Sequence, residues 1–165
     1  MPNFDPSTLA ALTFIRNGAR VDRPAELASL HIITGADTAL FNILGGKIAL
    51  LAIWGEVTVQ LDAVASLILL VGNPTVGTSV NLCAASAAIT SATVGQCFTM
   101  TGTLATPMVI SDAGGFLLQN NALVLDPGTI DLNSTITQTV VGGGMVKWTA
   151  FYLPLEDGAS MTSTI

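Results

Sequence analysis

Short apolar runs, separated by turn residues, fill this chain from about residue 29 onward. The runs are rich in Val, Ile, Leu and Thr, and Gly, Pro and Asn recur between them. β-Branched and aliphatic residues favour strands, whereas Gly, Pro and Asn favour turns. The pattern predicts strands near residues 29–34, 38–44, 47–60, 64–71, 78–86, 96–102, 107–111, 122–125, 129–138 and 145–153.

The number and spacing of these runs indicate the fold class. About eight to ten strands, with no helical pattern after residue 28, are typical of an all-β protein with an antiparallel β-sandwich or jelly-roll fold. An up-and-down barrel is the alternative. A chain of 165 residues is long enough to bury one core without a metal or a disulfide.

Two segments alternate in polarity, and the alternation assigns their faces. In residues 129–137, the apolar side chains expected to face the core are Ile130, Leu132 and Ile136. The polar side chains between them, Asp131 included, are expected to face solvent. In the last predicted strand, the shared inner face consists of Val146, Trp148, Ala150 and Tyr152.

Two other runs, at residues 48–53 and 66–71, have almost no polar position on either face. Strands of this kind are usually covered on both sides. Because no helix is predicted nearby, the simplest second cover is another subunit. The residues predicted to form that interface are Leu67, Leu69 and Val71.

Basic side chains are missing from residues 48–146, which contain no Lys, Arg or His. Charged residues make up only 10% of the chain, against roughly 25% in an ordinary globular domain. A surface so poor in charge favours assembly over catalysis. The net charge of −6 argues against nucleic acid or anionic lipid as the main partner, and no apolar run is long enough for a membrane-spanning helix. With no leader-like segment at its start, the chain is expected to be made in the cytosol.

The first 28 residues differ from the rest and are interpreted as an N-terminal arm. Ser7 is a plausible cap for one short helix that ends near Asn17 and Gly18. The three arginines of the chain, Arg16, Arg20 and Arg23, follow it and are balanced by three acids. They are candidate contacts to a protein partner, and a solvated linker is the equally weighted alternative. Residues 29–155 then form the β-sandwich domain and residues 156–165 a polar C-terminal tail.

Residues able to carry chemistry are few and scattered. His31 is the only histidine and lies in an apolar run, which favours a structural role. Cys83 and Cys97 lack metal-ligand spacing and are expected to be buried, reduced thiols. The acids Glu56, Asp62, Asp112, Asp126 and Asp131 are better explained by turns and solvated strand faces than by a carboxylate pair or a calcium loop. We therefore expect no catalytic, cofactor-binding or metal-binding residue, and not an enzyme.

Three stretches carry a resemblance to a known class of protein. They are GEVTVQLDAVAS at 55–66, DPGTIDL at 126–132 and VKWTAFYLPLE at 146–156. Together with the short arm and the charge-poor β body, they resemble the small jelly-roll decoration, or cement, proteins of tailed-bacteriophage capsids. The resemblance implies a homotrimer on the virion surface, made in the host cytoplasm, that clamps neighbouring major capsid subunits and has no catalytic residues.

A carbohydrate- or ligand-binding β-sandwich module, such as a tail, spike or head-fibre component, is the alternative function. Its candidate stacking residues are Trp54, Trp148 and Tyr152. Exposure of these aromatic rings at a loop rim favours binding, whereas burial in a sheet core or an interface favours a structural role.

Overall fold

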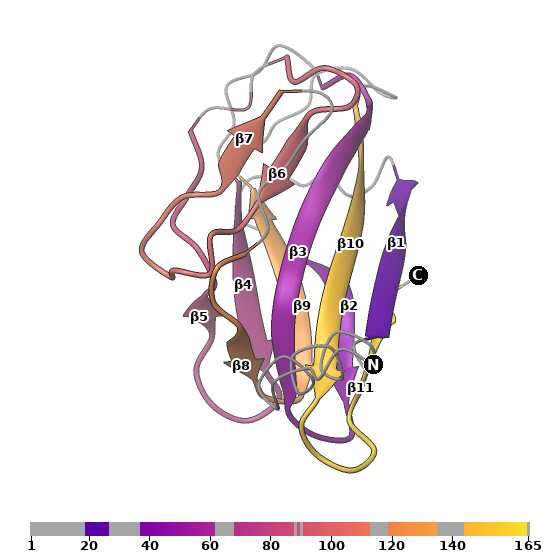
Figure 1. Ribbon diagram of the computed structural model, residues 1–165, viewed down its shortest axis with the longest axis vertical. Helices are drawn as coiled ribbons and strands as arrows, with labels where there is room; N and C mark the ends of the chain where they lie inside the picture. Colours follow the sequence, from indigo (N-terminus) through magenta and orange to yellow (C-terminus); the bar gives the residue numbers. More distant parts are fainter. Residues whose placement is uncertain are drawn as a thin grey trace, which may run out of the picture.

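The computed structural model describes residues 19–26, 37–61, 68–87, 89, 91–112, 119–134 and 144–164. These residues are all-β, with eleven strands in two antiparallel sheets and no helix (Figure 1). The first sheet has the order β1 (Ala19–Glu26), β10 (Met145–Pro154), β3 (Ile48–Val59), β6 (Cys97–Thr99) and β7 (Val109–Ser111), and β8 (Leu123–Leu125) also pairs with β3. The second has the order β11 (Ser160–Ser163), β2 (Asp37–Leu44), β9 (Gly128–Ser134), β4 (Ile68–Pro74) and β5 (Val80–Asn81).

The predicted all-β class is confirmed, and most predicted strands in the described residues match an observed one. The predictions at 38–44, 47–60, 122–125 and 145–153 agree closely with β2, β3, β8 and β10. The strand expected at 29–34 and the short N-terminal helix lie outside the described residues. Two strands were not predicted: β1 lies within the segment interpreted as an arm, and β11 within the polar tail.

The strand prediction at 78–86 is wrong, because only Val80–Asn81 has strand structure. Beyond Asn81, backbone and side-chain hydrogen bonds to β4 are mixed. The N–H groups of Leu82 and Ser86 donate to the carbonyls of Leu70 and Ile68, but the return bonds go to side chains. The N–H of Ile68 donates to Ser86 Oγ at 3.0 Å, and the N–H of Leu70 donates to Cys83 Sγ at 3.3 Å. These residues therefore follow β4 without a regular backbone ladder, which their apolar, β-rich composition does not reveal.

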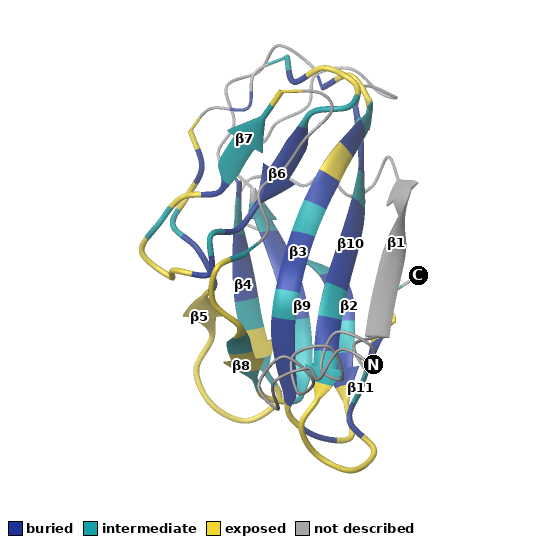
Figure 2. Ribbon diagram, viewed as in Figure 1, coloured by how far each residue is buried: buried dark blue, intermediate teal, exposed yellow. Residues whose placement is uncertain are grey.

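A single core lies between the two sheets (Figures 1 and 2). On β10, the predicted inner face is confirmed, since Val146, Trp148, Ala150 and Tyr152 are all buried. On β9, Ile130 and Leu132 are likewise fully buried. The expectation that Asp131 faces solvent is wrong, because this residue is only 4% exposed.

A glycine on β3 makes room for the largest side chain of the core. Gly55 lies opposite Trp148 in the pairing of β3 with β10. A Cβ atom at Gly55 would lie 2.7 Å from Val146 Cγ1 and 3.0 Å from Trp148 Cε2, too close for ordinary contact. The indole thus packs over the glycine backbone, an arrangement that glycine in a strand permits.

The two runs without a polar face are largely covered within one chain. All residues from Ile48 to Ile53 on β3 are buried or half-buried. On β4, Leu70 faces the core, whereas Leu69 is half-buried and Val71 is buried on the opposite face. Leu67 lies outside the described residues. Covering this strand therefore does not by itself require a second subunit.

Candidate functional site

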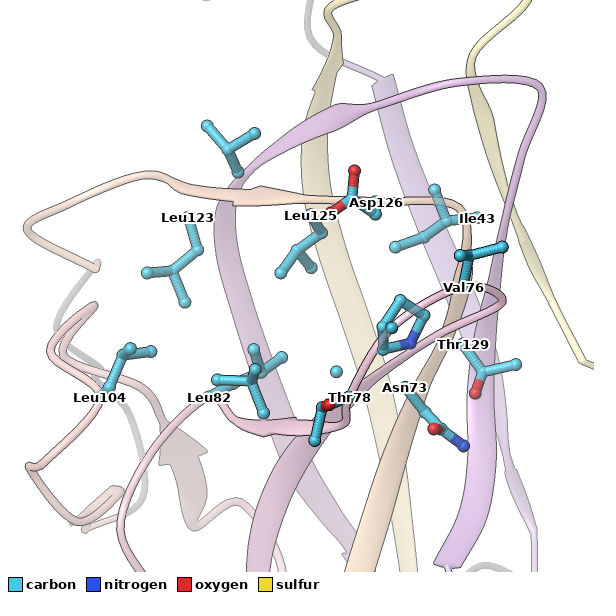
Figure 3. A pocket seen from close by; sticks show the side chains of 15 residues that line it. Ile43, Asn73, Val76, Thr78, Leu82, Leu104, Leu123, Leu125, Asp126 and Thr129 are labelled. Atoms are coloured by element: carbon cyan, nitrogen blue, oxygen red, sulfur yellow. The ribbon is translucent and has the colours of Figure 1, made fainter.

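A pocket opens between the two sheets on the side where β5 and β8 are the end strands (Figure 3). We call it the β5–β8 pocket. Its volume is about 270 Å³, and nine of its fifteen lining residues have aliphatic or proline side chains. Its inner wall includes Ile43 of β2 and Leu82, both buried, and Leu123 and Leu125 of β8 point into it. The pocket is therefore a mainly aliphatic hollow at the surface.

The rim of this pocket carries exposed apolar side chains. Val76 is 88% exposed, Val124 64%, Val80 49% and Leu104 46%. The described residues include eight large hydrophobic side chains that are exposed, so half of them surround this one pocket. Single exposed apolar residues are ordinary, but a contiguous group marks a contact or ligand surface.

The turn that bears Val76 is held by backbone contacts. The turn joins β4 to β5, and Gly77 within it has a φ of 124°, in the region that favours glycine. The N–H of Thr75 donates to the carbonyl of Pro127 at 2.8 Å, in the turn between β8 and β9. This bond ties the two turns together and holds Val76 beside the pocket.

The polar groups near the pocket are mostly paired with one another. Lys47 Nζ lies 3.3 Å from Asp126 Oδ1, with both side chains about half exposed. Asn73 Nδ2 donates to Asp131 Oδ2 at 3.2 Å, and Ser79 Oγ donates to Asn73 Oδ1 at 2.6 Å. An exposed ion pair such as Lys47–Asp126 adds little stability, but it neutralises the only charge that lines the pocket.

Asp131 is the one buried carboxylate among the residues whose burial is described. Its Oδ1 atom has no hydrogen-bond partner in the described part of the chain. It lies between Ala39 of β2 and Val71 of β4 in the sheet register. The described ranges contain no group of three His, Cys, Asp or Glu side chains that could hold a metal ion, so Asp131 has no partners there for a metal site.

The predicted partner-binding and interface residues are dispersed. Arg20 and Arg23 lie on β1, opposite Phe151 and Trp148 of β10, and Arg16 lies outside the described residues. Leu69 and Val71 are on β4, in the second sheet. No single surface in the described structure collects the two groups.

The acids weighed for catalysis do not form a cleft in the described structure. Glu56 is exposed on β3, Asp112 is exposed just after β7, and β6 lies between these strands. His31 and Asp62 lie outside the described residues. Strand β6 therefore separates the two described acids of this group, Glu56 and Asp112.

The aromatic residues proposed for carbohydrate stacking are mostly internal. Trp148 and Tyr152 belong to the core cluster. Trp54 is half-buried and stacks on Phe151, with ring centroids 6.0 Å apart and planes at 18°. None of the three is exposed at a loop rim, which is the position expected of a carbohydrate-binding ring.

Both cysteines are free and buried, as expected. Burial raises the pKa of the Cys83 thiol, and the hydrogen bond from the Leu70 backbone opposes the rise. The pKa of Cys97 is also raised, first by burial and then by the charge of Glu56, while the Ser111 side chain opposes it. Because the unfolded chain loses these protons at lower pH than the folded chain, the folded state loses stability as the pH rises above the ordinary thiol pKa.

We expect both thiols to react slowly with iodoacetamide at mildly alkaline pH while the protein is folded. The reactive species is the thiolate, and burial disfavours both ionisation and access. Alkylation followed by mass spectrometry, in native buffer and in denaturant, measures the ratio of rates. Comparable rates in the two conditions would contradict the buried placement of the thiols.

The β5–β8 pocket was not predicted from the sequence. Its rim residues come from four separate places in the chain, at positions 76, 80, 104 and 124. The only local signal is a valine in a turn, between Pro74 and Gly77, where polar residues are usual.

Fold and site together define an all-β domain whose described surface includes an exposed, mainly aliphatic pocket. Comparison with protein-family models, with curated proteins and with solved structures gives no match to this chain. In the part of the chain that is described, no helix is long and apolar enough to cross a membrane.

Proposed function

We propose that this protein is a structural component that assembles with copies of itself and has no enzymatic activity. The observation that carries the proposal is the group of exposed apolar side chains around the uncharged end strands β5 and β8. Surfaces of this composition resemble subunit interfaces, whose centres are depleted in charge.

The more specific form of the proposal is a jelly-roll decoration protein of a virion capsid, a homotrimer that clamps neighbouring major capsid subunits. Its support is the resemblance of three sequence stretches and the order of strand pairing. β2 pairs with β9, and the next strand, β3, pairs with β8. Such nested pairing of early with late strands is consistent with a jelly roll.

The burial of the aromatic rings favours this proposal over a carbohydrate-binding module. A sugar-binding platform needs an exposed ring face. Trp148 and Tyr152 instead stabilise the core, and Phe151 stacks on Trp54. The structural role is therefore the better supported of the two.

The native mass of the purified protein tests self-assembly directly. We expect sedimentation equilibrium in dilute buffer to give a stable oligomer, with a trimer mass of about three times 16.9 kDa. A monodisperse monomer over the accessible concentration range would contradict self-assembly.

The virion location has a separate test. Where the encoding genome yields particles, we expect the chain to co-purify with intact capsids through a density gradient, with mass spectrometry as the readout. Gradient-purified capsids that lack the chain would contradict the capsid proposal and leave self-assembly standing.

A further inference from the structure

We infer that Asp157 is a site of spontaneous covalent modification, at which the main chain rearranges to an isoaspartyl linkage. The inference is independent of the proposed function. It rests on the turn between β10 and β11, where Asp157 is followed by Gly158. This is the one Asp-Gly pair in the sequence.

The turn is tight and open to solvent. The N–H of Ala159 donates to the carbonyl of Glu156 at 3.1 Å, which closes a turn with Asp157 and Gly158 at its centre. Both central residues are exposed (Figure 2). Gly158 has a φ of 80°, as in the third residue of a type II turn, and a Cβ there would meet no atom beyond its chain neighbours within 4 Å. Neighbouring segments therefore leave this peptide bond uncovered.

The two groups that would react are free in the described part of the chain. The N–H of Gly158 donates no hydrogen bond there, and the Asp157 carboxylate has neither an ion pair nor a hydrogen bond. The neighbouring carboxylate of Glu156, by contrast, accepts from the Lys47 N–H at 2.9 Å. The Asp157 side chain can thus turn toward the adjacent amide without giving up a bond of its own.

The reaction needs no enzyme and no co-reactant other than water. The nitrogen of Gly158 attacks Cγ of the protonated Asp157 carboxyl, forms a C–N bond, loses its proton and expels one water molecule, which gives a cyclic succinimide. Water then adds at either imide carbonyl. Addition at Cγ restores aspartate, whereas addition at the main-chain carbon breaks its bond to the nitrogen. The second product is isoaspartate, with an extra methylene in the main chain and no change in mass.

The following residue and the exposure single out this aspartate. A side chain on the next residue hinders attack on Cγ, and Gly158 has none. Asp126 is also exposed in a turn, but Pro127 follows it and has no N–H to lose. Asp131 is only 4% exposed, within a strand that is paired on both sides. Of these three aspartates, only Asp157 combines exposure with a following glycine.

The modification acts on the docking of β11. A Cβ on Gly45 would collide with the carbonyl oxygen of Gly158, so the turns after β2 and β10 pack closely together. Directly beyond this turn, Ala159 and Met161 are buried in the core, and β11 pairs with β2. An extra main-chain methylene at Asp157 displaces atoms that this packing fixes. We therefore expect the isoaspartyl form to unfold at a lower urea concentration.

Peptide mapping of the aged full-length protein tests the site. Trypsin cuts after Lys147, and residues 148–165 contain no Asn, no further Lys or Arg and a single Asp, which is Asp157. Isoaspartate in this peptide, assigned by electron-transfer fragmentation, therefore has one source. We expect its fraction to rise over weeks at neutral pH and body temperature, while Asp126 stays unchanged.

Asp157→Glu is the matched control, because it keeps the negative charge while its longer side chain does not form the same ring with Gly158. We expect a second population with a lower urea midpoint in the aged unchanged protein and not in aged Asp157→Glu. Absence of isoaspartate from the aged folded protein would overturn the inference. If the chain in denaturant then forms it, the folded turn is what keeps the two groups apart. Equal losses of stability in both aged proteins would overturn the expected effect on β11.

Discussion

Replacing Leu70 by Asp is expected to leave the chain unfolded. Leu70 is 0% exposed and lies on the inner face of β4, opposite Leu132 of β9. The substitution would place a carboxylate in an aliphatic core with no basic side chain described nearby. Such burial costs several kcal/mol, at the extreme of single-residue effects, while a whole domain is stable by only about 5–15 kcal/mol.

The neighbouring residue provides the matched control for Leu70→Asp. Leu69 is the adjacent residue on the same strand, and alternation assigns it to the opposite face. It is half-buried and packs against the edge of the core cluster instead of lying inside it. Leu69→Asp is expected to keep the fold, at a cost of about 1–2 kcal/mol. Far-ultraviolet circular dichroism and urea unfolding of both variants measure the difference. A Leu70→Asp protein as stable as the unchanged chain would mean that the face assignment of β4 is reversed.

The same control distinguishes two possible interfaces. If copies meet through the β5–β8 pocket, Leu69→Asp should sediment like the unchanged protein. The sequence alone instead suggests an interface on the outer face of β4, at Leu67, Leu69 and Val71. If copies meet there, the Leu69→Asp protein should dissociate into monomers while remaining folded.

Replacing Trp148 by Ala is expected to lower the free energy of unfolding by about 3–5 kcal/mol. The side chain is 1% exposed, and it is among the largest fully buried groups of the core. Its Nε1 atom has no hydrogen-bond partner among the described residues, so the loss comes from packing rather than from a hydrogen bond. Trp148→Phe keeps an aromatic ring and is expected to cost less. Equal costs for Ala and Phe, measured by denaturant unfolding, would contradict a tightly packed indole.

Gly55 supplies a second check on this packing. Alone, Gly55→Ala should be destabilising by about 1–3 kcal/mol, because its Cβ meets Val146 and the indole ring of Trp148. In the Trp148→Ala background part of that clash is absent, so the same substitution should cost less. A double-mutant cycle measures this coupling. Strictly additive effects would mean that the ring does not lie over Gly55.

Local sequence patterns identified much of the second sheet and the long central strands of the first. Alternation on β9 and β10 correctly assigned Ile130, Leu132, Val146 and Trp148 to the core, because a strand exposes alternate residues to opposite faces. The pattern misled at Asp131, which is only 4% exposed and accepts a hydrogen bond from the Asn73 side chain of β4. It also misled at 78–86, where the Cys83 and Ser86 side chains accept two of the hydrogen bonds that backbone carbonyls would accept in a regular ladder.

Strands β1 and β11 illustrate a different limit of predicting strands from sequence. Both strands are rich in polar residues. β1 pairs with β10, and β11 pairs with β2. Strand preference depends strongly on such pairing, so a polar segment can become a strand when a long apolar neighbour offers a free edge. Composition alone instead indicated an arm and a tail.

By itself, the amino-acid sequence determined the all-β class, the principal strands, the core faces of β9 and β10 and the shortage of charge, because these depend on residue type and on spacing along the chain. Only the tertiary structure decided where the uncovered apolar surface lies. Val76, Val80, Leu104 and Val124 are far apart in sequence and unremarkable one by one. They form a single rim because the strand order makes β5 and β8 end strands on the same side of the core, and that order is set by long-range pairing, which no local pattern records.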